Sequence, residues 1–586
     1  MKKLRYILLL FACLLLWQCK PEPVPDPKPD VPDPAISIIG SSDISFSEDA
    51  GSSSVYFIST RDWTVTTGEN WIAVSPAEGE GSGNIVTLAV SCSDNPDETP
   101  RSGDVVIASG SISRVITVSQ SARKPSGPKS QECELSTLRF FPSSNPSLQE
   151  TISVVPRTIR NFRVLLITFP EGADMTAMAG SFEISKKAKV YAGNIELTSG
   201  KTPVDFTTCD YLTVVAEDGI HSTDYMVIAR RGDPYIDGKV YNFMSTYKIP
   251  AVGLAVTKGE KTVYAAGYGL AEADAGNTVI CTPEHLFRLA SVSKTITATC
   301  ILSLCQEGKL SLDDKVFAPG GPLASLFPGN HVMWADDIRV RDLLTHRSGW
   351  TNYCTGGTDP IFTGDARFYG KSVKQRVEYL LKNVNLAYTP GTYYSYYNMG
   401  FSILGLIIEQ VTGKSYEAYM REVAAQAGAD DIWVSRTPRS GKRANECVFY
   451  SQDGGYPYDN NMEISAACGG LTASAVDLAR ILTAIDYGSV VPDILGREWL
   501  DAMYTNYTNP GGKAGYGFGW WIEHYTMTNW AAYHTGSLSG TKTLWVRGKN
   551  GINGIILCNS SSPKDNFETA MFTTLDDAMS RVKSNY

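Results

Sequence analysis

Residues 286–308 read LFRLASVSKTITATCILSLCQEG. An apolar run follows Ser291-Val292-Ser293-Lys294 and stops at Gly308, which is typical of a helix with glycine just past its C-terminus. A serine and a lysine three residues apart share one helix face, one turn apart, so their side chains can meet. A serine hydroxyl becomes a good nucleophile only when a neighbouring base takes its proton. The stretch therefore predicts Ser291 as a nucleophile, with Lys294 or a group bonded to it as the base.

The four-residue spacing does not identify a site by itself. The alternative is that Ser291 caps a helix and Lys294 is exposed. The setting of Ser291, between an apolar segment and a long apolar helix, distinguishes it from the other places where Ser-x-x-Lys occurs. These are Ser121-Lys124, Ser126-Lys129, Ser245-Lys248, Ser561-Lys564 and Ser580-Lys583.

A second element is Tyr396-Tyr397-Asn398, which follows Pro390-Gly391 and precedes a helix predicted from Gly400 to Val411. It lies on a loop that enters a helix. The alternative is that the tyrosines of this loop only pack against one another.

A third element is His534-Thr535-Gly536-Ser537, between an aromatic strand and Gly540. Glycine has no side chain, so another backbone can come close to it.

The three elements, in this order and at this spacing, resemble the β-lactamase and penicillin-binding-protein family, in particular its members related to class C β-lactamases, D,D-peptidases and esterases. Three further phrases strengthen the resemblance: Leu343-Leu344-Thr345-His346-Arg347-Ser348-Gly349, residues 468–478, and Tyr516-Gly517-Phe518-Gly519-Trp520. The resemblance covers about residues 233–586. It implies a serine hydrolase that needs no metal and no organic cofactor.

The resemblance also implies a role for each element. Ser291, Lys294 and Tyr396 are the catalytic residues, and the amides of Ser291 and Ser537 form the oxyanion hole. The residues implied to bind substrate are Asn398, His534, Thr535 and Gly536. Gly536 is implied to lie on the strand that borders the active site, where the substrate backbone can approach a residue without a side chain. Tyr396 would need a strongly depressed pKa to act as a base, and Lys294 is the expected cause. His346 is expected to be structural.

His534 stands where typical β-lactamases carry lysine. This departure favours a D-amino-acid peptide or an ester as the small acyl substrate. Two alternatives remain open: a β-lactamase, and a glycan- or mucin-binding surface protein whose hydrolase domain is an inactive scaffold.

The pattern around these elements predicts an α/β (α+β) domain over residues 233–586, in which an antiparallel sheet is flanked by helices and a helical subdomain. One hairpin is expected near its start, over residues 251–266, and another near its end, over residues 543–557. We expect both hairpins to join one sheet.

Two all-β sandwich domains are predicted before the enzyme, over residues 36–121 and 133–232, joined by a linker at 122–132. The first contains Asp62-Trp63-Thr64-Val65, residues 70–76, a glycine-rich turn at 79–83, Arg101-Ser102-Gly103 and a closing Val118-Ser119-Gln120-Ser121. This pattern resembles the BACON domain, which implies glycan or mucin as a ligand. Trp63 and Trp71 could stack on sugars or fill the core. The second sandwich is interpreted as an immunoglobulin-like rigid spacer. Cys133 and Cys209 lie in it and could pair under oxidising conditions.

Residues 1–19 predict a lipoprotein signal peptide, because Lys2, Lys3 and Arg5 precede a short apolar run and Cys19 follows it in a lipidation box. Residues 20–35 alternate proline with polar residues and predict an extended stalk. We therefore expect a lipid anchor at Cys19 in the outer membrane, with the enzyme facing the periplasm or the cell surface. A net charge of -9 without a basic cluster argues against nucleic acid as a partner.

Overall fold

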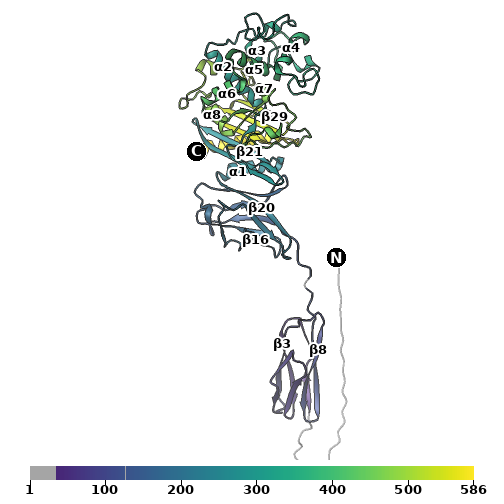
Figure 1. The fold of residues 1–586 in the computed structure, drawn as a ribbon. Helices are drawn as coiled ribbons and strands as arrows, with labels where there is room; N and C mark the ends of the chain where they lie inside the picture. Colours follow the sequence, from purple (N-terminus) through teal and green to yellow (C-terminus); the bar gives the residue numbers. More distant parts are fainter. Residues whose placement is uncertain (1–34, 126, 586) are drawn as a thin grey trace, which may run out of the picture. The chain divides into compact units, whose positions relative to one another are not determined.

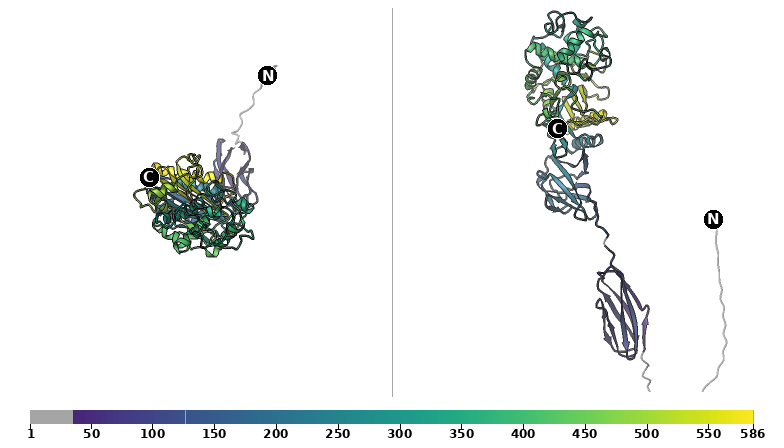
Figure 2. Two further views of the ribbon diagram at one scale, coloured as in Figure 1. Left: turned by 90° about the horizontal axis from the view of Figure 1, so that it is seen from above. Right: turned by 45° about the vertical axis from the view of Figure 1, so that its right-hand side comes forward.

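The computed structural model describes residues 35–125 and 127–585 of the chain. The signal peptide, Cys19 and nearly all of the stalk lie outside these residues. The described residues form two compact units, which divide between residues 129 and 130, and each is drawn in Figures 1 and 2. Within the described ranges, no helix combines the length and the apolar character that a bilayer crossing requires.

The first unit is a β-sandwich of two sheets. One has the order β1-β3-β7-β5 and the other β2-β9-β8-β4-β6. The strands are β1 (Ile36–Ile39), β2 (Asp43–Phe46), β3 (Gly51–Ser59), β4 (Trp63–Thr67), β5 (Ile72–Ser75), β6 (Glu78–Gly79), β7 (Ile85–Cys92), β8 (Arg101–Ser109) and β9 (Ile112–Gln120).

Trp63 and Trp71 belong to the core of this sandwich. Trp63 is 4% exposed and packs edge-on against Phe57, and Trp71 is 8% exposed beneath the Arg101 guanidinium. A sugar ring needs an exposed aromatic face to stack on. These two indoles therefore fill the core, which is one of the two alternatives that the sequence left open for them, and they do not form a sugar platform.

The second unit begins with another sandwich. Its main sheet has the order β12-β13-β20-β19-β16-β17, and a smaller one has the order β11-β10-β15. Cys133 and Cys209 are both free thiols here, and their sulfur atoms contact Thr223 and Tyr211 instead of each other. The strands are β10 (Leu135–Phe140), β11 (Ile152–Val154), β12 (Arg157–Ile159), β13 (Phe162–Phe169), β14 (Met178–Ala179), β15 (Ser181–Ile184), β16 (Lys189–Ala192), β17 (Ile195–Leu197), β18 (Pro203–Val204), β19 (Tyr211–Val215) and β20 (Ser222–Arg231).

An eight-stranded antiparallel sheet dominates the remainder, in the order β23-β22-β21-β31-β30-β29-β28-β27. The predicted hairpins are confirmed as β21 with β22 and β30 with β31, and β21 pairs directly with β31 from the far end of the domain. The strands are β21 (Ala251–Lys258), β22 (Lys261–Asp274), β23 (Asn277–Ile280), β27 (Gly515–Tyr516), β28 (Trp521–Ile522), β29 (Trp530–Leu538), β30 (Thr541–Gly548) and β31 (Ile552–Cys558).

Helices cover both faces of this sheet. On one face lie α1 (Pro234–Tyr247) and α10 (Phe567–Asn585); α8 (Ala475–Thr483) and the remaining helices lie beyond the other (Figures 1 and 2). Those helices are α2 (Ser293–Gln306), α3 (Val340–Leu344), α4 (Val373–Asn383), α5 (Asn398–Thr412), α6 (Tyr416–Ala425), α7 (Ala466–Gly469) and α9 (Arg497–Met503). A short sheet, β24 (Phe287–Arg288), β26 (Leu471–Ala473) and β25 (Trp433–Val434), lies beside α2.

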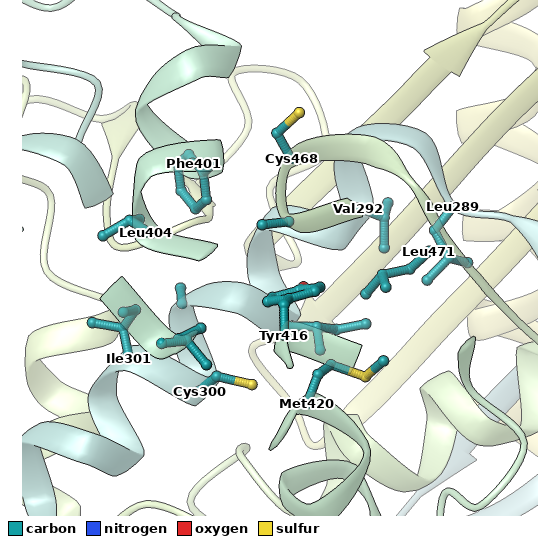
Figure 3. Packing of buried hydrophobic residues seen from close by; sticks show 14 of the residues in the cluster. Leu289, Val292, Cys300, Ile301, Phe401, Leu404, Tyr416, Met420, Cys468 and Leu471 are labelled. Atoms are coloured by element: carbon teal, nitrogen blue, oxygen red, sulfur yellow. The ribbon is translucent and has the colours of Figure 1, made fainter. Parts of the chain in front are cut away.

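Helix α2 is buried on every side. Every residue from Ser293 to Cys305 is buried, and the hydroxyls of Thr295, Thr297 and Thr299 are satisfied by carbonyls one turn earlier in the helix. Figure 3 shows side chains from three other helices, Phe401, Tyr416 and Cys468, around it. The helix that follows Ser291 is therefore the centre of the domain.

The second sandwich and the enzyme domain share one core. Alternate residues of β13 face opposite ways: Leu165 and Ile167 fill the sandwich interior, whereas Val164 and Leu166 join a cluster with α1 and the large sheet. Both faces of β13 are thereby buried. The sandwich is thus packed as part of the second unit.

Asp237 of α1 is the polar centre of this shared region. Its side chain is fully buried and accepts hydrogen bonds from Arg230 and Thr168 of the sandwich and from Tyr264 and Tyr268 of β22. A buried carboxylate is tolerated only when its oxygens are satisfied in this way.

We predict that Asp237→Ala lowers the free energy of unfolding of the second unit by about 3–5 kcal/mol, because it leaves the Arg230 charge without its carboxylate. The matched control is Lys239→Ala on the same helix, which removes only an exposed ion pair with Asp577 and should cost under about 1 kcal/mol. Urea unfolding of the full chain measures both. Equal, small losses would contradict the importance of the buried cluster.

Candidate active site

The turn that carries Ser291 is held from two sides. Ser291 lies in a short 3-10 turn, Ala290–Val292, directly before α2. The amide of Leu289 donates to the carbonyl of Leu471 at 2.8 Å, and the Leu289 carbonyl accepts from the Thr543 hydroxyl at 2.8 Å. Strands β26 and β30 therefore fix the backbone just ahead of the nucleophile.

Gly536 of β29 packs directly against this turn. A Cβ atom at position 536 would lie 2.2 Å from the Leu289 carbonyl oxygen and 3.0 Å from the Ala290 Cβ. The bare α-carbon thus makes room for the backbone of the nucleophile's own turn. The expectation that this glycine admits the substrate backbone does not describe its main contact.

The amine of Lys294 lies against the hydroxyl of Ser291. The Nζ–Oγ distance is 3.1 Å, and Nζ also donates to the carbonyl of Cys468 at 2.6 Å. Lys294 is completely buried, and this burial lowers its pKa to about 8, against the opposing influence of Cys468 and Asp359. Close to neutral pH, part of the enzyme therefore has an uncharged amine ready to accept the serine proton.

Tyr396 completes the group around the nucleophile. Its phenol lies close enough to Ser291 for that residue to influence its pKa, and its ring centre lies 4.8 Å from Lys294 Nζ. Burial raises the pKa of the phenol, and the neighbouring Ser291 offsets only part of that effect. The expected depression of this pKa was wrong, because Lys294 faces the ring of Tyr396 and burial disfavours the phenolate. Tyr396 is a neutral hydrogen-bonding group in the resting enzyme.

His534 is sealed inside the domain. Its Nε2 lies 3.0 Å from the Tyr516 hydroxyl and its Nδ1 lies 2.6 Å from the Thr535 carbonyl. Burial and the nearby Lys294 lower its pKa to about 3, so the ring is neutral. A carbonyl can only accept, so Nδ1 carries the proton and Nε2 accepts from Tyr516. Both nitrogens are in use, which disagrees with the expectation that His534 binds substrate.

The other two residues of the third element point away from the core. Thr535 is half-buried and Ser537 is exposed. Because Gly536 contacts the turn of Ser291, Ser537 lies beside that turn, as a second oxyanion donor would need to.

His346 supports the ring of Tyr396. The two ring centres are 4.2 Å apart, and His346 Nδ1 accepts from the Tyr397 amide at 3.1 Å. Burial, with Lys294 and His534 nearby, holds the pKa of His346 well below its ordinary value. A neutral histidine that packs against the catalytic loop agrees with the structural role expected for it.

Asn398 begins α5 and is fixed by a residue that the sequence did not single out. Its Nδ2 donates to Asp359 Oδ2 at 2.7 Å. Asp359 lies in a loop without apolar periodicity, so nothing in the sequence distinguished it from an ordinary turn aspartate. Tyr516 was quoted only as part of a strand phrase, and its bond to His534 requires the fold to be seen.

Comparison with known proteins agrees with this architecture. A family model described as "Beta-lactamase" matches residues 236–577, and the BACON model, described as "Putative binding domain, N-terminal", matches residues 61–121.

Curated relatives match about 180 residues of the chain. They include the Staphylococcus aureus "Protein flp" (29% identical over 185 residues, 32% of this chain and 34% of that protein) and the Bacillus subtilis "N-acetylmuramyl-L-alanine amidase" (32% over 181 residues, 30% and 40%). The Escherichia coli "Putative D-alanyl-D-alanine carboxypeptidase" is 29% identical over 184 residues, which are 30% of this chain and 40% of that protein. The chain thus spans well under half the length of these relatives.

Two solved structures are also similar. A class C β-lactamase has a TM-score of 0.49 at 21% identity, and the matched region covers 60% of this chain and 96% of that chain. The D-amino acid amidase of Ochrobactrum anthropi SV3 has a TM-score of 0.48 at 22% identity, and the matched region covers 60% of this chain and 98% of that chain.

We predict that kcat/KM for an ester rises with pH to a plateau, with a midpoint near the Lys294 pKa of about 8. The neutral amine is the form that accepts a proton, so each pH unit below the midpoint should cost about tenfold. Tyr396→Phe should reduce the rate by about 10²–10⁴-fold and leave the midpoint in place. If the pH profile of Tyr396→Phe no longer showed an ionisation near pH 8, the ionising group would be the phenol of Tyr396 and not the amine of Lys294.

We further predict that Gly536→Ala reduces kcat by about 100-fold or more, because the added methyl displaces the turn that bears Ser291. Gly364→Ala, where the methyl group meets open space, is the matched control and should retain activity. Stopped-flow acylation with an activated ester measures both. Normal acylation by Gly536→Ala would show that the turn tolerates a shift of this size.

Proposed function

The chain belongs to the β-lactamase family, and on that premise we propose that its enzyme domain hydrolyses a small amide or ester through an acyl-enzyme on Ser291. One observation carries the proposal: the Ser291 hydroxyl lies 3.1 Å from a buried amine whose pKa is about 8. A nucleophile and a base within hydrogen-bonding distance are the minimum for this chemistry.

The mechanism uses only residues of this chain. Lys294 accepts the hydroxyl proton as Ser291 attacks the substrate carbonyl, and the amides of Ser291 and Ser537 stabilise the oxyanion. The proton passes to the leaving group, with the Tyr396 hydroxyl as the relay between Lys294 and the leaving atom. Water then attacks the acyl-enzyme, Lys294 and Tyr396 again move the proton, and Ser291 is released with the free acid.

The charge of the site favours an uncharged leaving group. His534 is neutral, and its two nitrogens are occupied, so the third element supplies no cation to bind a carboxylate. We propose D-amino-acid amides, esters, or peptides whose leaving group carries no carboxylate as substrates, in keeping with the amidase name of one relative. β-Lactams, which carry a carboxylate, are the disfavoured alternative.

The test of the mechanism is a fluorophosphonate probe, which labels activated serines. We predict that the wild type is labelled and that Ser291→Ala is not. The matched control is Ser561→Ala, since Ser561 has the same spacing to Lys564, whose Nζ donates to the carbonyl of Thr246. Equal labelling of wild type and Ser291→Ala would remove the mechanism.

The test of substrate class is a panel of steady-state rates. We predict that p-nitrophenyl esters and D-amino-acid amides exceed a chromogenic cephalosporin and D-alanyl-D-alanine peptides by at least about tenfold in kcat/KM. Preference for either carboxylate substrate would overturn the argument from the neutral histidine.

We also propose that the mature protein is a lipoprotein held in the outer membrane through Cys19, and that residues 36–121 bind a glycan or mucin. Support for the anchor comes from the signal-like segment before Cys19, and support for the ligand from the BACON match. Protease shaving of intact cells tests the first proposal and glycan-array binding the second.

A further inference from the structure

A cavity of about 610 Å³, the junction cavity, lies where the second sandwich meets the enzyme domain. The sandwich lines it with Arg157 of β12 and with Arg160 in the turn that follows. The enzyme domain contributes Ser245 and Lys248 from the C-terminal end of α1, and the loop at residues 450–452. Small-molecule sites usually measure about 300–1,000 Å³, so the junction cavity has room for a ligand of the size of a sugar.

Three cations line this cavity: Arg157, Arg160 and Lys248. Within the described ranges, none of them is paired with a carboxylate. By contrast, Arg230 and Arg581 at the other end of α1 each form a salt bridge with an aspartate of that end. The chain as a whole has a net charge of -9. The junction cavity therefore reverses the sign of the charge locally, which favours an anion.

The carboxylates near the cavity bind other groups. Asp274, which influences the pKa of Tyr450 on the cavity wall, forms a salt bridge with Arg439. Asp453 follows the loop of the cavity and accepts a hydrogen bond from the Ser451 hydroxyl at 2.6 Å. Neither aspartate lines the cavity. The three cations thus face a space in which a ligand would be the source of negative charge.

Arg157 is held in one orientation by neutral groups of α1. Its guanidinium donates to the Tyr241 carbonyl at 3.1 Å, to Asn242 Oδ1 at 3.0 Å and to the Ser245 hydroxyl. Burial lowers the pKa of Arg157, and the opposing influence comes from Tyr241 and not from a carboxylate. A partly buried cation without a counterion costs free energy, and a bound oxyanion would offset that cost.

Arg160 is also fixed, although it is exposed. It occupies the turn between β12 and β13 with a φ of 53°, and its guanidinium lies 4.1 Å from the centre of the Tyr450 ring. Stacking on a ring holds the plane of a guanidinium and leaves its N–H groups free at the edge. Within the part of the chain that the structure describes, no acceptor binds these N–H groups. They are available to an oxyanion.

The rest of the wall suits the body of a sugar. Thr158 and Ser245 add hydroxyl groups, and the Ser245 oxygen accepts from Arg157, so its own proton is free to donate. Val155 and Pro250 supply apolar surface. A sugar ring has hydroxyl groups around its edge and C–H groups on its faces, and arginine binds the oxygens of a phosphate or sulfate ester. Both kinds of surface are thus present beside the cations.

We propose that the junction cavity is a binding site for a sugar-sized molecule that carries a phosphate or sulfate ester. The ester binds Arg157, Arg160 and Lys248, and the sugar ring packs against the apolar wall. Ser291 is not among the lining residues. The proposal therefore does not depend on the acyl-enzyme chemistry and adds a second site to the chain.

The test is isothermal titration calorimetry on the full-length protein. The probes are the 6-phosphates and 6-sulfates of glucose, galactose and N-acetylglucosamine, the three parent sugars and inorganic phosphate. At about 0.1 M ionic strength, charges more than about 10 Å apart are largely screened, so distant charges contribute little. We expect at least one ester to bind about tenfold or more tightly than both its parent sugar and inorganic phosphate. The ester that binds more tightly identifies the oxyanion.

Two variants locate the site, and a third is the matched control. Arg160→Asn and Lys248→Asn each remove one cation, and asparagine tolerates the left-handed backbone at both positions. Each should weaken ester binding by about fivefold or more. The control is Lys187→Asn, which removes the same charge from a left-handed position of the same sandwich, where Lys187 is paired with Glu217. It should keep the wild-type affinity within about twofold.

Thermal melting establishes that all three variants fold, and each binding result then has a defined meaning. A loss in either cavity variant, with Lys187→Asn unchanged, supports the proposal. Wild type that binds no ester would overturn it, as would an affinity for inorganic phosphate or the parent sugar equal to that for the ester. Unchanged affinity in both cavity variants, or an equal loss in Lys187→Asn, would show that the cavity is not the site.

Discussion

The contact between the α-carbon of Gly536 and the carbonyl of Leu289 is the constraint on which the site depends. It joins β29, near the end of the chain, to the turn that carries Ser291, near the start of the enzyme domain. That meeting is possible only because β21 pairs with β31, so that both ends of the domain form one sheet. The Thr543 hydroxyl secures the same carbonyl from β30. The position of the nucleophile is thus a consequence of sheet closure.

Burial then sets the protonation states of the side chains around Ser291. Removal from water disfavours every charged form, so it lowers the pKa of Lys294 to about 8, lowers that of His534 to about 3 and raises that of Tyr396. One physical effect therefore leaves a single group, the Lys294 amine, able to exchange a proton near neutral pH. The same effect keeps the His534 ring neutral and the Tyr396 phenol protonated. Burial alone therefore accounts for the direction of the pKa shift at all three residues.

Much of this was predictable from the sequence, and the failures share a cause. The hairpins and the helix after Ser291 follow from turn residues and apolar periodicity, which are local properties, and the meeting of Ser291 with Lys294 follows from helix geometry. The direction of the Tyr396 pKa was wrong because burial of a side chain is a tertiary property. Gly536 was correctly expected to permit a close approach, but the approaching backbone could be identified only in the fold. Asp359 could not be identified from the sequence, because its place in the site depends on its tertiary contact with Asn398.

The back of the sheet bears on the site as much as the front. Along β21, Ala251 and Ala255 face the core around α2, whereas Val252, Leu254 and Val256 face the core shared with α1, α10 and the second sandwich. The sandwich contributes Val164, Leu166, Met226 and Ile228 to that core, and its Arg230 is paired with the buried Asp237. A free-standing spacer would bury none of these residues against the enzyme. The second sandwich is therefore better understood as a third layer of the enzyme domain, because it covers α1 and, through it, the sheet whose other face positions Ser291.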